Sequence, residues 1–135
     1  MLARLRQALH GLPEKPRVLH IEDDADLRQV IAEQGRTLAE FNSASSLTEA
    51  RQLLSQGSYD LILLDLGLPD GNGLELLEEL HQHHSGVPVV VLSAQDLPAE
   101  HLGQVEASLA KSRTSAQQFL HLLARLLPTK ENRHA

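Results

Sequence analysis

Short apolar runs alternate along the chain with segments in which apolar residues recur at the spacing of a helical turn. Such runs are typical of buried strands, and the segments between them predict helices with one apolar face. The central runs show no polar and apolar alternation, as expected for strands covered on both faces. This order predicts an α/β fold, in which helices cover both faces of a doubly wound parallel sheet. The expected strands are 18–21, 39–41, 61–64, 87–92 and 108–110.

Capping residues mark the expected starts of the helices. An Asp, Asn or Ser side chain can accept a hydrogen bond from the first turn of a helix, and Glu or Gln three residues later strengthens the signal. The candidate starts are Asp24, Ser46 with Glu49, Asn72 with Glu75, and Ser115 with Gln118.

Polar side chains follow four of the expected strands. In an open parallel sheet, the functional crevice lies beyond the carboxyl ends of the strands, so these side chains are expected to meet there. Taken alone, each has a simpler explanation; an Asp after a strand is often a turn former or a helix cap. The side chains are Glu22–Asp24 after the first strand, Asp65 after the third, Ser93 after the fourth and Lys111 after the last.

Composition excludes several classes of function. The 135 residues suit one domain, and 12 basic against 18 acidic side chains give a net charge of −6, which does not favour nucleic acid or an anionic membrane. The chain has no cysteine, which excludes disulfides and Cys-ligated zinc. The sequence shows neither a membrane span nor a signal-peptide block. We therefore expect a soluble, cytoplasmic protein with no direct nucleic-acid or membrane partner.

Several carboxylates in one crevice repel one another. At an effective dielectric constant of about 20, two such charges about 4 Å apart cost about 4 kcal/mol. Either some of them are protonated, as in an acid–base dyad, or a hard cation neutralises them. Oxygen ligands without Cys or His favour magnesium over zinc, and magnesium commonly accepts phosphate oxygens. The site therefore suits phosphoryl chemistry, with Asp65 as nucleophile and Ser93 and Lys111 as donors to the phosphoryl oxygens.

Four motifs together resemble the receiver domains of two-component signalling. The motifs are Val18–Asp24, Asp60–Gly73, Val89–Ala94 and Ala110–Lys111, and the resemblance covers roughly residues 17–127. It implies a flavodoxin-like sheet of five strands in the order 2-1-3-4-5. It also implies that an aspartate accepts a phosphoryl group from a histidine kinase or a histidine-phosphotransfer protein. Such a domain is not an enzyme in the ordinary sense, although it catalyses its own phosphorylation.

The resemblance also implies a role for each polar residue at the sheet edge. Asp65 matches the phosphoacceptor, and Asp24 is left as the cap of the first helix. The remaining roles concern the magnesium ion and the phosphoryl oxygens. They fall on Glu22, Asp23, Asp65 and the main-chain carbonyl of Gly67 for the metal, and on Ser93 and Lys111 for the phosphoryl group.

The sequence departs from the family pattern next to Lys111. The family usually has Tyr or Phe three residues before the lysine, where its rotamer reports phosphorylation, but here that residue is Ser108. A proline usually follows the lysine, often after a cis bond, but here Ser112 follows. Because a cis bond before a residue other than proline costs about 3–4 kcal/mol, we expect a trans bond.

The connection between the last two strands is also unusual. Only 17 residues separate Ser93 from Lys111, fewer than is usual in the family. The stretch Gln95–Glu106 contains Pro98 and Gly103 and has hardly any apolar periodicity. We expect a fourth helix that is shortened or missing. We also expect the domain to be a monomer in isolation, because dimers of DNA-binding family members generally use that face.

The expected organisation has three parts. Residues 1–16 form a linker or an appended N-terminal helix, 17–128 the receiver domain and 129–135 a C-terminal tail. The prolines at 13 and 16 suit a linker, as when a receiver follows the kinase core of a hybrid histidine kinase.

Two other functions compete with phosphoryl acceptance. A receiver-like interaction module would keep the fold without the chemistry, but the complete set of polar residues argues against it. A magnesium-dependent phosphohydrolase acting through Asp65 would commonly carry a second acid at the position of Gly67.

Three further polar features have structural explanations. His20 is expected to be a hydrogen-bonded core histidine rather than a catalytic one. The histidines in Leu80–His84 are expected on a solvated helix end, and Asp70 is expected to serve a turn.

Overall fold

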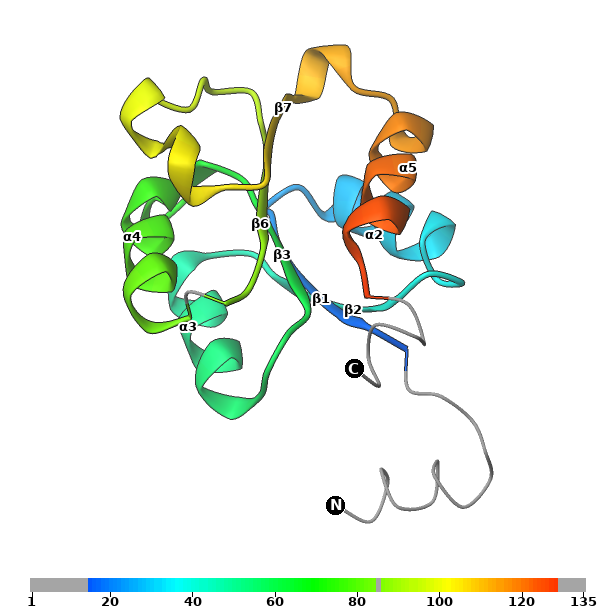
Figure 1. The fold of residues 1–135 in the computed structure, drawn as a ribbon, viewed down its shortest axis with the longest axis horizontal. Coiled ribbons are helices and arrows are strands. Elements are labelled where there is room, and N and C mark those ends of the chain that lie inside the picture. The colour runs from blue at the N-terminus through cyan, green and yellow to red at the C-terminus, as the bar shows by residue number, and fades with distance from the viewer. Residues whose placement is uncertain (1–14, 85, 129–135) are drawn as a thin grey trace.

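A single sheet of five parallel strands organises the chain, as Figure 1 shows. The structure is a computed structural model and describes residues 15–84 and 86–128. The strand order β2-β1-β3-β6-β7 is the order 2-1-3-4-5 expected from the sequence. The strands are β1 (Arg17–Ile21), β2 (Glu40–Ala44), β3 (Leu61–Leu64), β6 (Val89–Ser93) and β7 (Ala107–Ala110).

Helices cover both faces of this sheet. Helices α2 (Ala25–Gln34) and α5 (Ala116–Leu126) lie on one face, and α3 (Leu47–Gln56) and α4 (Gly73–His83) lie on the other (Figure 1). Alternate residues of each central strand therefore enter separate cores. In β3, Leu61 and Leu63 pack toward α2 and α5, while the other two residues pack toward α3 and α4. All four β3 residues are fully buried, which explains the continuous apolar run.

Three of the four predicted helix starts have the expected caps. Asp24 accepts hydrogen bonds from the first turn of α2, and full capping boxes open α4 at Asn72 and α5 at Ser115. At α3 only one of the two hydrogen bonds of the predicted capping box forms. Ser46 accepts from Glu49 N, but the Glu49 carboxylate turns to the amide and hydroxyl of Ser45, 2.6 and 3.1 Å away.

The segment between β6 and β7 confirms the prediction of a shortened fourth helix. It contains only the 3₁₀-helix η1 (Ala99–Gln104). Leu102 in this segment leaves 53% of its surface exposed, so η1 does not bury this apolar side chain. After β7 the chain continues into the 3₁₀-helix η2 (Lys111–Arg113), and the described residues contain no cis peptide bond.

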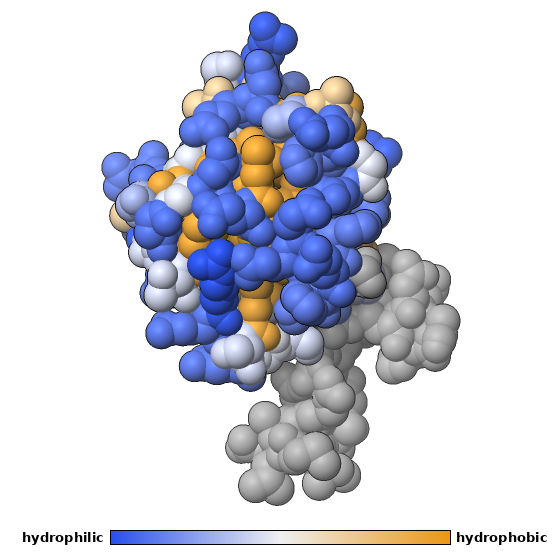
Figure 2. Space-filling model, turned by 90° about the vertical axis from the view of Figure 1, so that its left-hand side faces the viewer, coloured by the Kyte–Doolittle hydropathy of each residue, from blue (hydrophilic) through white to orange (hydrophobic). Residues whose placement is uncertain are grey.

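The face of the molecule shown in Figure 2 is largely hydrophilic, with an apolar band near its middle and smaller apolar spots toward its left and upper edges. Among the described residues, no helix is long and apolar enough to cross a membrane. The predicted tail and nearly all of the predicted N-terminal linker or helix lie outside the described residues, whose termini are 15 and 128.

A small hairpin follows β3, and the sequence analysis did not anticipate it. Its strands are β4 (Gly67–Leu68) and β5 (Gly71–Asn72), paired antiparallel. The hairpin lies between the end of β3 and the start of α4, so it borders the carboxyl edge of the sheet.

Candidate functional site

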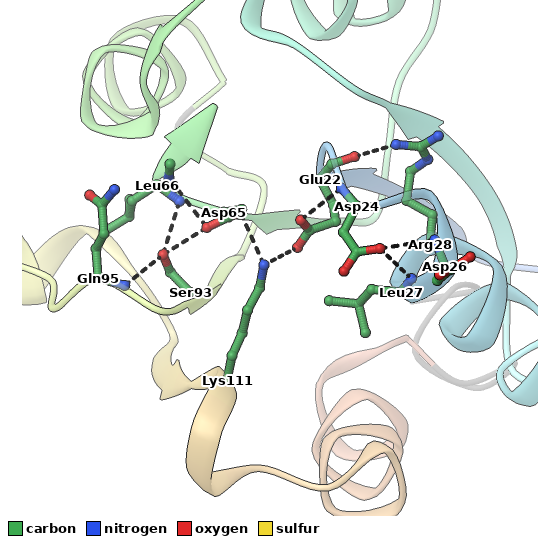
Figure 3. Close-up of polar contacts among 11 residues, drawn as sticks. Glu22, Asp24, Asp26, Leu27, Arg28, Asp65, Leu66, Ser93, Gln95 and Lys111 are labelled. Carbon is green, nitrogen blue, oxygen red and sulfur yellow. Dashed lines mark hydrogen bonds and ion pairs between the residues drawn. The ribbon is translucent and has the colours of Figure 1, made fainter. Parts of the chain in front are cut away.

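Strand pairing brings four polar residues together at the carboxyl edge of the sheet (Figure 3). The register aligns Ile21 of β1 with Leu64 of β3, so the residues that follow them, Glu22 and Asp65, are neighbours. Main-chain hydrogen bonds continue this pairing beyond the strands, because Asp65 N donates to Ile21 O at 3.0 Å. Ser93 ends β6 and Lys111 follows β7.

Three carboxylates form one cluster at this edge. One oxygen from each of Glu22, Asp23 and Asp65 lies within 4.8 Å of the other two. Glu22 and Asp65 are buried, with 1% and 6% of their surface exposed, whereas Asp23 is exposed. The residues predicted as an acidic pair and an acceptor therefore lie together. Among the described residues, the histidines at the end of α4 belong to no comparable cluster.

Lys111 places its charge between the two buried carboxylates. Its Nζ lies 2.7 Å from Glu22 Oε1 and 3.1 Å from Asp65 Oδ2 (Figure 3). Partial burial would lower the pKa of the Lys111 ammonium, but the contacts with Glu22 and Asp65 outweigh it and raise that pKa. The ammonium is therefore fully charged and offsets part of the carboxylate repulsion.

Asp65 is held in its ionised form. Burial alone would raise the pKa of the Asp65 carboxyl, but hydrogen bonds from Ser93, Lys111 and the Gly67 amide outweigh it and lower that pKa. Ser93 Oγ donates to Oδ1 at 2.7 Å and Gly67 N donates to the same oxygen at 3.3 Å. A charged carboxylate at the edge of the sheet can act as a nucleophile.

The pKa of Glu22 shifts in the opposite direction to that of Asp65. Burial raises the pKa of the Glu22 carboxyl and the nearby Asp65 charge adds to the effect, while Lys111 and the Asp24 amide only partly offset it. Its Oε2 accepts from Asp24 N at 3.1 Å. Its Oε1 is buried and, despite the short ion pair with Lys111, accepts no hydrogen bond of acceptable geometry. Glu22 thus presents a buried oxygen that lacks a full set of partners.

The donor set fits a hard divalent cation. Carboxylate oxygens with no sulfur or imidazole among them are the ligands that magnesium prefers. The buried Glu22 Oε1, without a hydrogen bond of acceptable geometry, supports the same fit because a cation would satisfy it.

Ser93 is fixed by its surroundings as well as directed at Asp65. Its hydroxyl accepts from Leu66 N at 3.3 Å and from Gln95 N at 3.1 Å while it donates to Asp65 (Figure 3). These bonds hold the Ser93 hydroxyl at the acceptor aspartate.

The turn from β1 into α2 explains how the three successive acids divide their roles. Asp24 Oδ1 accepts from Asp26 N and Leu27 N, 3.0 and 3.3 Å away, so it is the cap that the sequence predicted. Arg28 Nη1 donates to Glu22 O at 2.6 Å and braces the turn. Asp23, between Glu22 and Asp24 in sequence, is the exposed member of the carboxylate cluster.

Two residues near the site were not recognised from the sequence. Gln95 lies over Gly67, because a Cβ built on that glycine would be 2.8 Å from Gln95 Nε2. Asp70 lies in the turn of the hairpin, as expected, but its carboxylate also accepts hydrogen bonds from the start of α3, which was not anticipated. No local sequence signal reveals either contact, because the partners are distant along the chain.

The comparisons with known proteins agree with this geometry. The response regulator receiver domain family matches residues 18–111, and the chain belongs to this family of two-component signalling. The response regulator PilR of Pseudomonas aeruginosa is 31% identical over 107 residues, which are 78% of this chain and 22% of PilR. The transcriptional regulatory protein BasR of Escherichia coli is 34% identical over 120 residues, which are 86% of this chain and 54% of BasR. The chain thus spans from about a fifth to about half of the length of these relatives.

Solved structures show the same fold. The non-phosphorylated HemR receiver domain of Leptospira biflexa is 32% identical, with a TM-score of 0.75 over 83% of this chain and 94% of that domain. The receiver domain of the Francisella response regulator 1452 is 26% identical, with a TM-score of 0.73 over 83% of this chain and 96% of that domain.

His20 lies below the site within the core. It is buried with 3% of its surface exposed, so the prediction of a core position is confirmed. Burial, followed by the charges of Lys111 and Arg28, lowers the pKa of His20 from 6.5 to about 4.

The lowered pKa of His20 predicts a loss of stability in acid. In the unfolded chain the His20 imidazole binds a proton below about pH 6.5, whereas in the native protein it does so only near pH 4. The stability that the neutral, buried imidazole contributes is therefore complete above pH 6.5 and is lost as the pH falls to 4. The difference between the two pKa values of His20 corresponds to about 3 kcal/mol in the free energy of unfolding. Urea titrations between pH 7 and 4, with chelator present, should show this loss in the unmodified protein relative to His20→Leu. Parallel pH profiles for the two proteins would contradict it.

Proposed function

We propose that this chain accepts a phosphoryl group on Asp65 from a phosphohistidine of a histidine kinase or histidine-phosphotransfer protein. One observation carries the proposal: the buried Asp65 belongs to a carboxylate cluster and accepts hydrogen bonds from two donors, Ser93 and Lys111. The carboxylates suit a metal ion, and the donors suit the oxygens of a phosphoryl group.

In the proposed transfer, an Asp65 oxygen attacks phosphorus while the bond between phosphorus and the histidine nitrogen breaks. The imidazole leaves with the electron pair of that bond. Ser93 and Lys111, whose donor atoms already reach Asp65, would redirect their hydrogen bonds to the phosphoryl oxygens. Because strand ends and the bonds around Ser93 fix both donors, little reorganisation is needed as charge develops.

The metal site in this proposal consists of Glu22, Asp23, Asp65 and the Gly67 carbonyl, with magnesium as the cofactor. Magnesium would neutralise carboxylate charge and polarise the phosphoryl group. The side chains of the cluster support the assignment by their spacing and their oxygen ligands. The family resemblance and its position two residues after Asp65 support Gly67 as a member of the set.

The two competing functions fit the site less well. A phosphohydrolase with a second acid two residues after the nucleophile would need a carboxylate at Gly67, where this chain has no side chain. A silent interaction module would have no need of a lysine placed between two buried carboxylates.

We further propose that this receiver works as part of a larger protein. The prolines at 13 and 16 support a linker, and joining a kinase core in a hybrid histidine kinase would suit the shortened η1 segment. The relatives named as regulators are much longer than the matched region. The parent gene sequence tests the hybrid-kinase setting: a kinase core before residue 1 supports it, and fusion to a DNA-binding domain instead would contradict it.

Acetyl phosphate should phosphorylate Asp65 only in the presence of magnesium, because the carboxylate charge must be neutralised before an anionic donor can approach. Intact mass spectrometry should show one added phosphoryl group, absent from Asp65→Asn and retained in the control Asp26→Asn, which alters an exposed carboxylate in α2. Equal labelling of Asp65→Asn, or labelling in excess chelator, would refute the assignment.

Asp23→Ala should weaken magnesium binding more than Glu22→Ala. The Asp23 carboxylate is exposed and can meet an entering ion directly, whereas Glu22 shares Oε1 with the Lys111 ammonium, 2.7 Å away, and its Oε2 accepts from the Asp24 amide. We expect a loss of at least about tenfold for Asp23→Ala, measured by calorimetric or NMR titration. The reverse order would show that the roles of the two acids are exchanged.

Phosphorylation should not drive dimerisation through the face formed by η1, β7 and α5. Ser108 is exposed on β7 and cannot repack that face as an aromatic residue would, and η1 is only a short 3₁₀-helix. A modification shifts an equilibrium only through different interactions with its two states. Sedimentation velocity of phosphorylated and unmodified protein at matched concentration should give the same species. A shift to dimer that mutations on this face abolish would contradict the prediction.

A further inference from the structure

The first turn of α3 takes its hydrogen-bond acceptors from two distant parts of the chain. The amino end of any helix leaves amides without partners inside the helix. Ser46 Oγ serves Glu49 N at 3.1 Å, as a local cap does. Leu47 N and Thr48 N instead donate to the two carboxylate oxygens of Asp70, at 2.8 and 3.0 Å. Asp70 is therefore a second cap of α3, supplied by the loop after the acceptor aspartate.

The Asp70 carboxylate is well suited to this task. Thr48 Oγ1 adds a third hydrogen bond at 2.9 Å to the oxygen that receives Thr48 N. The bonds from the Leu47 and Thr48 amides are the main causes that lower the pKa of Asp70, so the carboxylate is ionised at neutral pH. A negative charge at the amino end of α3 is also favoured by the helix dipole.

Asp70 stands at the turn of the β4–β5 hairpin, which carries Gly67. The hairpin pairs Gly67 with Asn72 and Leu68 with Gly71, so the position of its turn is linked to that of Gly67. The turn also packs closely on α3. A Cβ built on Gly71 would lie 2.6 Å from Leu47 Cδ1, and its φ of +155° likewise favours glycine.

We propose that Asp70 is a positioning residue for the metal site, which holds the Gly67 carbonyl in place by clamping the hairpin to the amino end of α3. This inference rests on the proposed function, in which the Gly67 carbonyl binds magnesium. The hairpin has only two residue pairs of its own, so its orientation depends on what its turn contacts. Asp70 ties the turn to the amino end of α3, and Asn72, in the second strand of the hairpin, caps α4.

The clamp also couples the metal site to α3. If Asp70 raises the affinity for magnesium by fixing Gly67, then magnesium must strengthen the clamp by the same factor, because such linkage is reciprocal. The amides of Leu47 and Thr48 report on the clamp directly, since they donate to Asp70. A cap that served α3 alone would give no such response.

The experiment compares Asp70→Ala with Ser46→Ala, its matched control. Both variants remove a cap from the first turn of α3, but only the first releases the hairpin. We expect Asp70→Ala to weaken magnesium binding about tenfold, as measured by calorimetric titration with magnesium chloride. Ser46→Ala should bind magnesium as the unmodified protein does, despite a lower thermal stability. Asp70→Asn, which keeps the acceptor oxygen but loses the charge, should fall between them.

Hydrogen exchange provides the second measurement. Saturating magnesium should slow exchange at the Leu47 and Thr48 amides of the unmodified protein by a factor of about ten, matching the affinity change. Equal magnesium affinity in Asp70→Ala and Ser46→Ala, or exchange at these amides that ignores magnesium, would overturn the positioning role. If Asp70→Ala does not fold, Asp70→Asn and the exchange measurement decide. An unmodified protein that binds no magnesium would overturn the proposed function and this inference with it.

Discussion

Repulsion among carboxylates at the carboxyl edge of the sheet is the constraint on which the site depends. Glu22, Asp23 and Asp65 share one small region, and two of them are buried. Lys111 relieves the repulsion only in part. The two buried carboxyl groups respond in opposite ways: hydrogen bonds lower the pKa of Asp65, whereas burial raises the pKa of Glu22. The carboxylate that must react is thereby kept charged, and its buried neighbour is left with an oxygen that a cation would satisfy.

The fold brings the carboxylates together at this edge and also holds their neighbours in fixed positions. Parallel strands end at one edge, so residues far apart in sequence meet there without any long loop. Main-chain bonds extend the sheet pairing to Asp65 itself, and Ser93 is locked by two backbone amides. The elements beyond the edge differ in how firmly they are held. The hairpin after Asp65 is tied to α3 through Asp70, whereas η1 is a short segment with an exposed Leu102. A change at the site is therefore expected to reach α3 more readily than η1.

The sequence predicted those features that local patterns encode. Continuous apolar runs identified β1, β3 and β6, and cap residues identified the starts of α2, α4 and α5. Pro98, Gly103 and the lack of periodicity indicated the shortened η1 segment. Strand β2 extends to Ala44, beyond its predicted end, because pairing with β1 rather than apolar character defines it. The contacts of Glu49, Gln95 and Asp70 were missed because each depends on which atoms the folded chain brings together. The clustering of the site residues was predictable, since it follows from strand order, but their opposite pKa shifts required the contacts themselves.

The charge state of Asp65, which Lys111 and Ser93 hold ionised beside Glu22, can be measured directly. Carbon-detected NMR titration of the two carboxyl groups, in protein free of divalent cations, would follow each group separately. The role of Lys111 and Ser93 requires that Asp65 titrates below its usual range and Glu22 above its own, and that Lys111→Met raises the pKa of Asp65. An Asp65 that titrates at or above its usual range, or one that is indifferent to the loss of Lys111, would contradict it.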